Sequence, residues 1–364
     1  MPADNFSLLS LVLESCKPRT SHGTSSASRS ARALPYVLDI EQRQHVLDQC
    51  IRLARDARGQ NEERLDYLHR ILAAIYDYRF SVPGIELVDA DLGPLFTDIA
   101  SLLEPVMFDL ELEQIEADAD VLDDLPVEGE AFLDWLKRTL SEHPAGTHPF
   151  YRTFLREEAD VESVKVFLAQ ETTLDPRFDD ILALMQVGTR GAEKMEIAKN
   201  YFDEMGCGDE LGVHTYLFGK ALDAVGIDDE YLKRTLLPAS RVSGNLSACL
   251  VVNQRHHYKA LGYYGVSEYL APRRFKDLVA GWRRLGLPEE GLAYHDLHIR
   301  IDAVHGKAWF DNVIRPLVDH DPRVVKEIAV GALIRLNSSE RYLASLHQLL
   351  ARRQGDAYPD AAHA

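Results

Sequence analysis

Apolar residues recur at helical spacing along most of the chain, and the strict alternation typical of half-buried strands is rare. Leu65, Leu68, Leu72 and Ile75 form one such series, which covers one face of a helix. Runs of β-branched residues, which favour strands, are also rare. The chain is therefore predicted to be all-α, built from many helices of moderate length.

Composition divides the 364 residues into four segments. Residues 1–35 include a Ser-, Arg- and Thr-rich stretch with few large apolar side chains, which predicts a disordered N-terminal segment. Residues 36–126 combine helical periodicity with many acidic residues, and we expect a helical extension that serves dimerisation. Residues 127–352 are long enough to form a core domain with a sizeable apolar interior. Residues 353–364 are expected to be a flexible tail.

The chain is strongly acidic, with 58 Asp and Glu against 40 Lys and Arg and a formal charge of −18. Binding to nucleic acid or to anionic membranes needs clustered Lys and Arg. We therefore expect neither partner. The negative charge is compatible with a small-molecule substrate that is neutral or cationic.

Four cysteines are scattered without a CxxC pair, so neither a disulfide scaffold nor a cysteine zinc site is expected. No apolar run reaches the length of about 18 residues that a transmembrane helix needs. The short apolar run at residues 8–13 lacks the basic region that precedes it in secretory signals. These features predict a cytoplasmic protein.

The most informative motif is HxxxDxxH, formed by His298, Asp302 and His305. On a helix these residues fall within about 60° of one another. An apolar stripe runs beside them: Leu297, Ile301, Val304 and Ala308. Two imidazoles and a carboxylate that border a buried face need a partner, and iron, manganese or zinc would supply it. The alternative is a solvated helix face that carries three polar residues.

A second candidate pair is Glu204 and His214, which lie ten residues apart. On an ideal helix they would point about 80° away from each other. Gly206, Gly208 and Gly212 lie between them and destabilise a helix by roughly 1 kcal/mol each. A break at these glycines would let the two side chains converge. The alternative is a plain loop that joins two helices.

Two further carboxylates fall on apolar helix faces. Glu171 follows Val164, Phe167 and Leu168 at helical spacing, and Glu268 follows Leu261 and Tyr264 in the same way. A single such glutamate is usually at the edge of an apolar stripe, with its carboxylate in water. Two of them in one helical chain, together with the histidine motif, favour a metal site.

Four segments resemble the haem-oxygenase-like diiron oxidases, also called iron-containing redox enzymes. They are FLAQE at 167–171, NYFDEMGCGD with a following histidine at 200–214, YYGVSE at 263–268 and LHIRIDAVH at 297–305. The resemblance covers roughly residues 128–350, and the order and spacing of the four segments match the family. It implies a haem-oxygenase-like helical bundle as the core.

The resemblance also implies a ligand set for two Fe(II) ions, with O₂ as co-substrate. Carried over position by position, the ligands are Glu204, His214, Glu268, His298, Asp302 and His305. The N-oxygenating members have a further carboxylate from an earlier core helix, for which Glu171 is the candidate. A ferritin-like site would need two ExxH motifs, and no such pair is found. A single-iron site needs only three ligands and would leave the other polar residues without a role.

The family divides between oxygenation of an amine nitrogen and oxidation of a carbon chain by decarboxylation, desaturation or C–C cleavage. Both reactions need a small-molecule substrate, O₂ and an external electron donor. The candidate ligand Glu171 and the helical extension, which looks like a homodimerising one, favour N-oxygenation of an amine in natural-product biosynthesis. A third alternative is a non-catalytic helical scaffold with a degenerate metal site.

Overall fold

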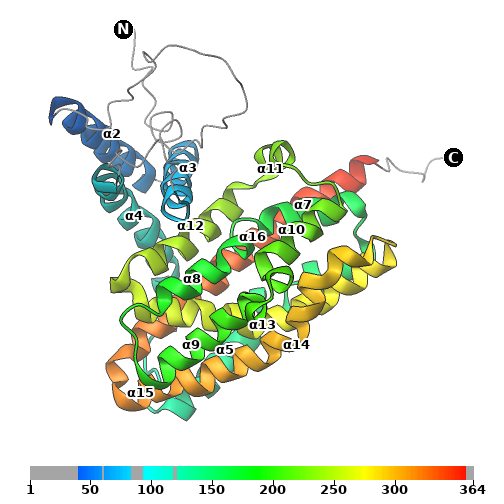
Figure 1. Cartoon of the computed structure of the whole chain (residues 1–364). Coiled ribbons are helices and arrows are strands. Elements are labelled where there is room, and N and C mark those ends of the chain that lie inside the picture. The colour runs from blue at the N-terminus through cyan, green and yellow to red at the C-terminus, as the bar shows by residue number, and fades with distance from the viewer. Residues whose placement is uncertain (1–39, 60, 83–92, 118–120, 358–364) are drawn as a thin grey trace, which may run out of the picture. The chain divides into compact units, whose positions relative to one another are not determined.

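The structure is a computed structural model, and it describes residues 40–59, 61–82, 93–117 and 121–357. All regular elements within these ranges are helices, which confirms the prediction of an all-α protein (Figure 1). The predicted disordered segment 1–35 lies outside the described residues, as does the end of the predicted tail. None of the described helices combines the length and the apolar character that crossing a membrane requires.

The chain forms two compact units, residues 1–111 and 112–364. The boundary predicted from composition, at residue 126, lies later in the chain than this division. The described residues of the first unit form three helices, of which the third continues into the second unit: α2 (Ile40–Arg58), α3 (Glu62–Arg79) and α4 (Gly93–Glu116).

Helix α3 shows why the first unit folds as it does. It begins where the side chain of Asn61 accepts a hydrogen bond from the amide of Arg64, which satisfies one of the free N–H groups of the first turn. The predicted apolar residues Leu68, Leu72 and Ile75 are all buried. The hydroxyl of Tyr76 donates a 3.0 Å hydrogen bond to the buried carboxylate of Glu104 on α4.

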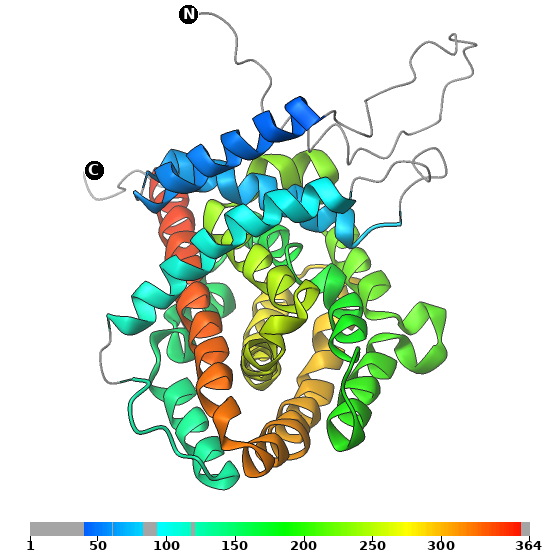
Figure 2. The same ribbon diagram turned by 90° about the vertical axis from the view of Figure 1, so that its left-hand side faces the viewer.

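The second unit is larger. Its longest element is helix α16 (Val325–Ala357), which is orange to red in Figure 2. The α-helices that precede it in this unit are α5 (Gly129–Glu142), α6 (Pro144–Thr147), α7 (Val161–Glu171), α8 (Phe178–Met185), α9 (Gly191–Glu204), α10 (His214–Ala224), α11 (Asp229–Thr235), α12 (Pro238–Val252), α13 (His257–Arg284), α14 (Ala293–Trp309) and α15 (Arg315–His320). Two π-helical segments are Phe150–Glu158 and Phe310–Ile314. Short 3₁₀ turns are Asp175–Arg177, Gly206–Gly208, Glu210–Gly212, Gln254–His256, Glu289–Leu292 and Pro322–Val324.

Helix α13 is central to this unit and packs against both α14 and α16. The approach of α13 to α14 is close at Gly306, where an added Cβ would lie 2.9 Å from the Cα of Tyr269 and 3.1 Å from the carbonyl carbon of Glu268. Only glycine allows the two backbones to come so near. This contact brings Glu268 on α13 beside His305 on α14.

Helix α13 contains a proline, a residue that usually ends or kinks a helix. The structure instead continues α13 through Pro272 and breaks the chain at Asn253, whose backbone is extended. An internal proline costs a helix about 3 kcal/mol. Packing on α14 and α16 outweighs this penalty.

Candidate metal centre

The first cluster of candidate ligands combines the end of α9, the start of α10 and the middle of α14. Glu204, His214 and His298 each offer a ligand atom, and these atoms lie within 4.8 Å of one another. Nδ1 of His214 is 2.7 Å from Oε2 of Glu204, and Nε2 of His298 is 3.6 Å from Oε1 of the same carboxylate. All three side chains are buried. We call this set the first group.

The second cluster joins α13 to the next two turns of α14. Glu268, Asp302 and His305 bring their ligand atoms within 4.8 Å of one another. Nδ1 of His305 is 3.9 Å from Oε2 of Glu268. These three side chains are also buried, and we call them the second group. The structure thus brings six of the seven predicted site residues into two neighbouring groups, which share helix α14.

The segment between Glu204 and His214 reverses the chain by two short 3₁₀ turns. Gly206 has φ of +61°, and a Cβ there would lie 2.7 Å from the amide nitrogen of Val213. Cys207 also adopts a positive φ of 54°. The break that the glycines predict is therefore present, and it turns His214 back onto Glu204.

On α14 the polar residues are the more deeply buried ones. His298, Asp302 and His305 are 5%, 5% and 2% exposed, whereas Val304 in the predicted apolar stripe is 55% exposed. The apolar stripe was predicted to be the buried side of the helix, but Val304 is exposed and Leu297, Ile301 and Ala308 are only partly buried. The helix turns its polar stripe inward because the partners of that stripe come from α9, α10 and α13.

Two of the three α14 histidines, His298 and His305, are oriented by their other ring nitrogens. Nδ1 of His298 is 2.7 Å from the carbonyl oxygen of Tyr294, and Nε2 of His305 is 2.8 Å from Oδ2 of Asp203. A hydrogen bond of this kind fixes the tautomer and leaves the opposite nitrogen as a ligand atom. Nε2 of His298 and Nδ1 of His305 therefore face the first and second group respectively.

Several atoms in the groups lack the partners that burial demands. Nδ1 of His214 and Oε2 of Glu268 are buried without a hydrogen-bond partner, although such atoms are normally satisfied. The 2.7 Å contact of His214 with Glu204 does not have hydrogen-bond direction. Two atoms that bind one metal ion at right angles lie about 3 Å apart. Carboxylates with imidazoles suit iron, so the residues present fit this metal.

The charges in the groups show what is missing without a cation. Burial raises the pKa of Glu204, but His214 and His298 outweigh it and lower the pKa to about 2. Burial, Asp302 and Glu204 together raise the pKa of Glu268 well above its ordinary value. Burial also raises the pKa of Asp302 to about 7, against the lowering effect of His298. Only a bound cation would keep all three carboxylates ionised at neutral pH.

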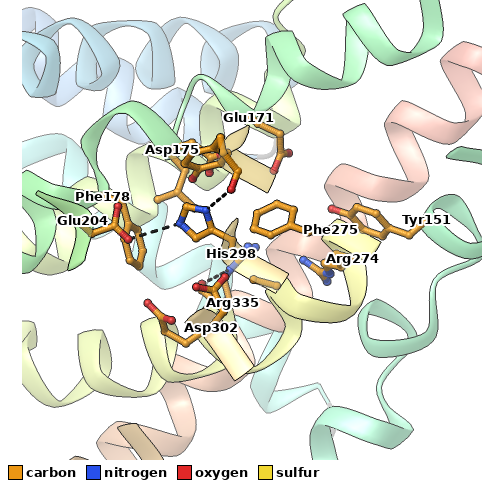
Figure 3. Close-up of a pocket in the computed structure, with 15 residues that line it drawn as sticks. Tyr151, Glu171, Asp175, Phe178, Glu204, Arg274, Phe275, His298, Asp302 and Arg335 are labelled. Carbon is orange, nitrogen blue, oxygen red and sulfur yellow. Dashed lines mark hydrogen bonds and ion pairs between the residues drawn. The ribbon is translucent and has the colours of Figure 1, made fainter. Parts of the chain in front are cut away.

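A cavity of about 70 Å³ adjoins the two groups. Its lining includes ligand candidates from both groups, with Tyr151, Glu171, Leu174, Asp175, Phe178, Ser267, Ala271, Arg274, Phe275, Tyr294 and Arg335. Figure 3 shows Glu204, His298 and Asp302 on one side of the view and Arg274 and Tyr151 on the other, with Phe275 between them. A molecule in this cavity would therefore reach the metal groups with one end.

Glu171 is the one predicted ligand that the structure does not bring into either group. Its carboxylate lies in the cavity wall, where Oε1 accepts a 2.8 Å hydrogen bond from the hydroxyl of Tyr342. Burial raises its pKa, while Tyr342, Arg335 and Arg274 act in the opposite direction. The apolar helix face around Glu171 is as predicted, since Val164, Phe167 and Leu168 are buried.

Two carboxylates near the groups escaped the sequence analysis. Asp203 holds His305, and its only sequence signal is its position next to Glu204. Asp175 is buried in the cavity wall, and its Oδ2 has no hydrogen-bond partner. It lies four residues after Glu171, but beyond the end of α7, so helical periodicity could not place it.

The comparison with protein-family models agrees with this geometry. The model of the iron-containing redox enzymes matches residues 165–340, a range that includes all seven predicted site residues. No curated protein matches the chain. The matched range covers the helices that carry both groups, which confirms the predicted family and the haem-oxygenase-like helical bundle. Residues 165–340 of the chain belong to the iron-containing redox enzyme family.

Proposed function

We propose that this oxidoreductase is an O₂-dependent non-haem diiron oxygenase that oxygenates the nitrogen of a small amine in natural-product biosynthesis. The observation that carries the proposal is the pair of buried groups, each with both carboxylate and imidazole ligands, that open onto one cavity. Each group offers three protein ligands, which would leave coordination positions open.

A second metal ion is favoured by the charge of the second group. Glu204 lies close enough to Glu268 to raise its pKa, so the two groups interact electrostatically. One ion in the first group would leave Glu268 and Asp302 buried without a counter-charge. Two neighbouring buried carboxylates stay ionised together only when a cation binds between them.

Two bound Fe(II) ions would supply the redox chemistry that activates O₂, with an external electron donor to restore them. The chain's own residues prepare the site for that chemistry. Asp203 and the carbonyl of Tyr294 hold His305 and His298 in the orientation that binding requires. The near-complete burial of both groups excludes bulk water, which strengthens each electrostatic contact.

The choice of an amine rests on the polarity of the cavity. Asp175 has an unpartnered carboxylate oxygen, and burial, Glu171 and then Glu204 raise its pKa. A carboxylate in this place accepts a hydrogen bond from an amine N–H and holds the nitrogen beside the first group. Glu171, which first suggested N-oxygenation, supports it only as part of the cavity wall.

Carbon-chain oxidation is the second candidate function. Leu174, Phe178, Ala271 and Phe275 give the cavity an apolar wall that would accommodate an alkyl chain. The two candidates differ in the atom that is oxidised and can be distinguished in one reaction.

The test begins with anaerobic titration of the metal-free protein with Fe(II), for which we expect two equivalents bound per chain. O₂, a chemical reductant and either amines or fatty acids follow, and mass spectrometry identifies the products. Oxygenated amines would support N-oxygenation, and shortened or unsaturated chains would support carbon oxidation. A protein that binds no iron in stoichiometric amount would contradict both functions and favour the scaffold alternative.

A further inference from the structure

Two arginines in the cavity have no carboxylate partner. Arg274 on α13 and Arg335 on α16 both line it, and neither forms an ion pair with any residue that the structure describes. Their charges interact, since Arg335 contributes to lowering the pKa of Arg274. A partly buried cation without an ion-pair partner is costly, so two such arginines around one cavity favour an anionic ligand.

The hydrogen bonds of the two guanidinium groups leave several donors open. Arg274 donates to the carbonyl of Ala145 at 3.0 Å and to Oγ of Ser339 at 3.1 Å, both through one terminal nitrogen. Arg335 donates through Nε to Oγ of Ser267 at 2.8 Å. A guanidinium has five N–H donors, so each arginine keeps further donors for a ligand.

Each of the two guanidinium groups lies against a tyrosine ring. The guanidinium carbon of Arg274 lies 5.1 Å from the centre of the Tyr151 ring, and that of Arg335 lies 5.4 Å from the centre of the Tyr263 ring. These contacts stabilise the cations by cation–π attraction and fix their planes. Little side-chain freedom would then be lost when an anion binds.

Glu171 does not form an ion pair with either arginine. Its charge acts on both guanidinium groups, but it lies beyond ion-pair distance from each of them, and Tyr342 occupies its Oε1. It therefore screens the two cations without using their donors.

We propose that Arg274 and Arg335 bind the carboxylate of the substrate, which is a small amino-carboxylic acid. Figure 3 places Arg274 across the cavity from Glu204 and Asp302, with Arg335 toward the middle. A carboxylate on the arginines would leave the amine end of the molecule near Asp175 and the first group. The carboxylate part of this inference holds for either candidate reaction, and the amine part rests on the proposed function.

The experiment measures binding to the metal-free full-length protein by calorimetry. The probes share one carbon chain: caproate has the carboxylate, hexylamine the amine, and ε-aminocaproate both. We expect both carboxylates to bind at least about tenfold more tightly than hexylamine, the ratio that charge-assisted hydrogen bonds supply. Inorganic phosphate tests whether the arginines prefer a carboxylate or a phosphate. Tighter binding of phosphate than of caproate would overturn the carboxylate assignment.

Variants then locate the site. Arg274→Gln and Arg335→Gln should each weaken both carboxylates by about tenfold or more and leave hexylamine unchanged. Arg274→Lys should retain part of the affinity, because the charge remains but the fork is lost. Arg273→Gln is the matched control, since Arg273 is the exposed neighbour on α13 and does not line this cavity. Circular dichroism checks that each variant folds.

Equal affinities of caproate and hexylamine, or no saturable binding of carboxylates at millimolar concentration, would overturn the proposal even if every glutamine variant failed to fold. So would unchanged carboxylate affinity in both folded glutamine variants. Because no iron is present, these outcomes are independent of the diiron proposal. Iron binding without carboxylate binding contradicts only this inference, and the reverse result contradicts only the diiron function.

Discussion

At the scale of single residues, His298 links the protonation of the site to metal binding. Burial lowers its pKa, but the charges of Asp302 and Glu204 outweigh this effect and raise the pKa to about 10. In the metal-free protein the imidazole therefore carries a proton at neutral pH. This proton contributes stability that is complete below the ordinary pKa of 6.5 and is lost as the pH rises through about 10.

Iron must displace this proton, because only the neutral imidazole is a ligand. We predict that Fe(II) affinity increases with pH, by about tenfold per pH unit for one released proton. Anaerobic calorimetry at several pH values, in buffers of different ionisation enthalpy, measures both the affinity and the proton count. Affinity that stays constant or falls between neutral and mildly alkaline pH would contradict this account of His298.

Asp203 is predicted to act only through His305. Asp203→Ala should weaken iron binding to the second group by about 10–100-fold, the usual effect of removing the carboxylate behind a metal-binding histidine. The first group should retain its iron. Titration with Fe(II) resolves the two sites, and Glu210→Ala serves as an exposed control in the same segment. Equal loss at both groups would show that Asp203 supports the whole segment instead.

Residue spacing alone predicted that His298, Asp302 and His305 share one face of α14, since helical geometry fixes their relation. It could not say which side of that helix is buried, because this depends on neighbours far away in sequence. The same limit explains Glu171, whose helix face was predicted correctly but whose partner is Tyr342 on α16. Asp175 gave no periodic signal at all.

At the scale of elements, the turn between α9 and α10 forms the first group. Gly206→Ala places a Cβ at positive φ against the backbone of Val213, and we expect it to destabilise the protein by about 1–3 kcal/mol and to weaken iron binding in the first group. Gly219→Ala is the matched control, because Gly219 lies within α10 with open space around it. That variant should be more stable by about 0.5–1 kcal/mol.

Chemical denaturation of the metal-free protein gives both free energies of unfolding. The account of the turn fails if Gly206→Ala is as stable as the unmodified protein and binds two equivalents of iron normally. Sequence could locate this turn by its glycines, but it could not give the two 3₁₀ turns that close it, which depend on contacts between Gly206 and Gly212.

At the scale of the whole molecule, the candidate site lies entirely within the second compact unit. We predict that deletion of residues 1–111 converts a homodimer into a monomer and leaves iron binding intact, since no ligand candidate lies in that part of the chain. Light scattering gives the oligomeric state, and Fe(II) titration gives the metal content. A dimeric truncated protein, or a folded one that binds no iron, would contradict this division of roles.

The two groups differ in how much of each is assembled before metal arrives. The second group lies on α13 and α14, which the close contact at Gly306 locks together, whereas the first needs the turn at residues 206–212 to close. Ordering that turn costs conformational entropy that only the first group must overcome. Iron should therefore load in sequence, into the second group before the first. Stepwise titration would show two unequal affinities, with His305→Ala removing the tighter one. The protein would then pass through a form with iron in the second group alone. In a cell short of iron, this form would be folded but inactive.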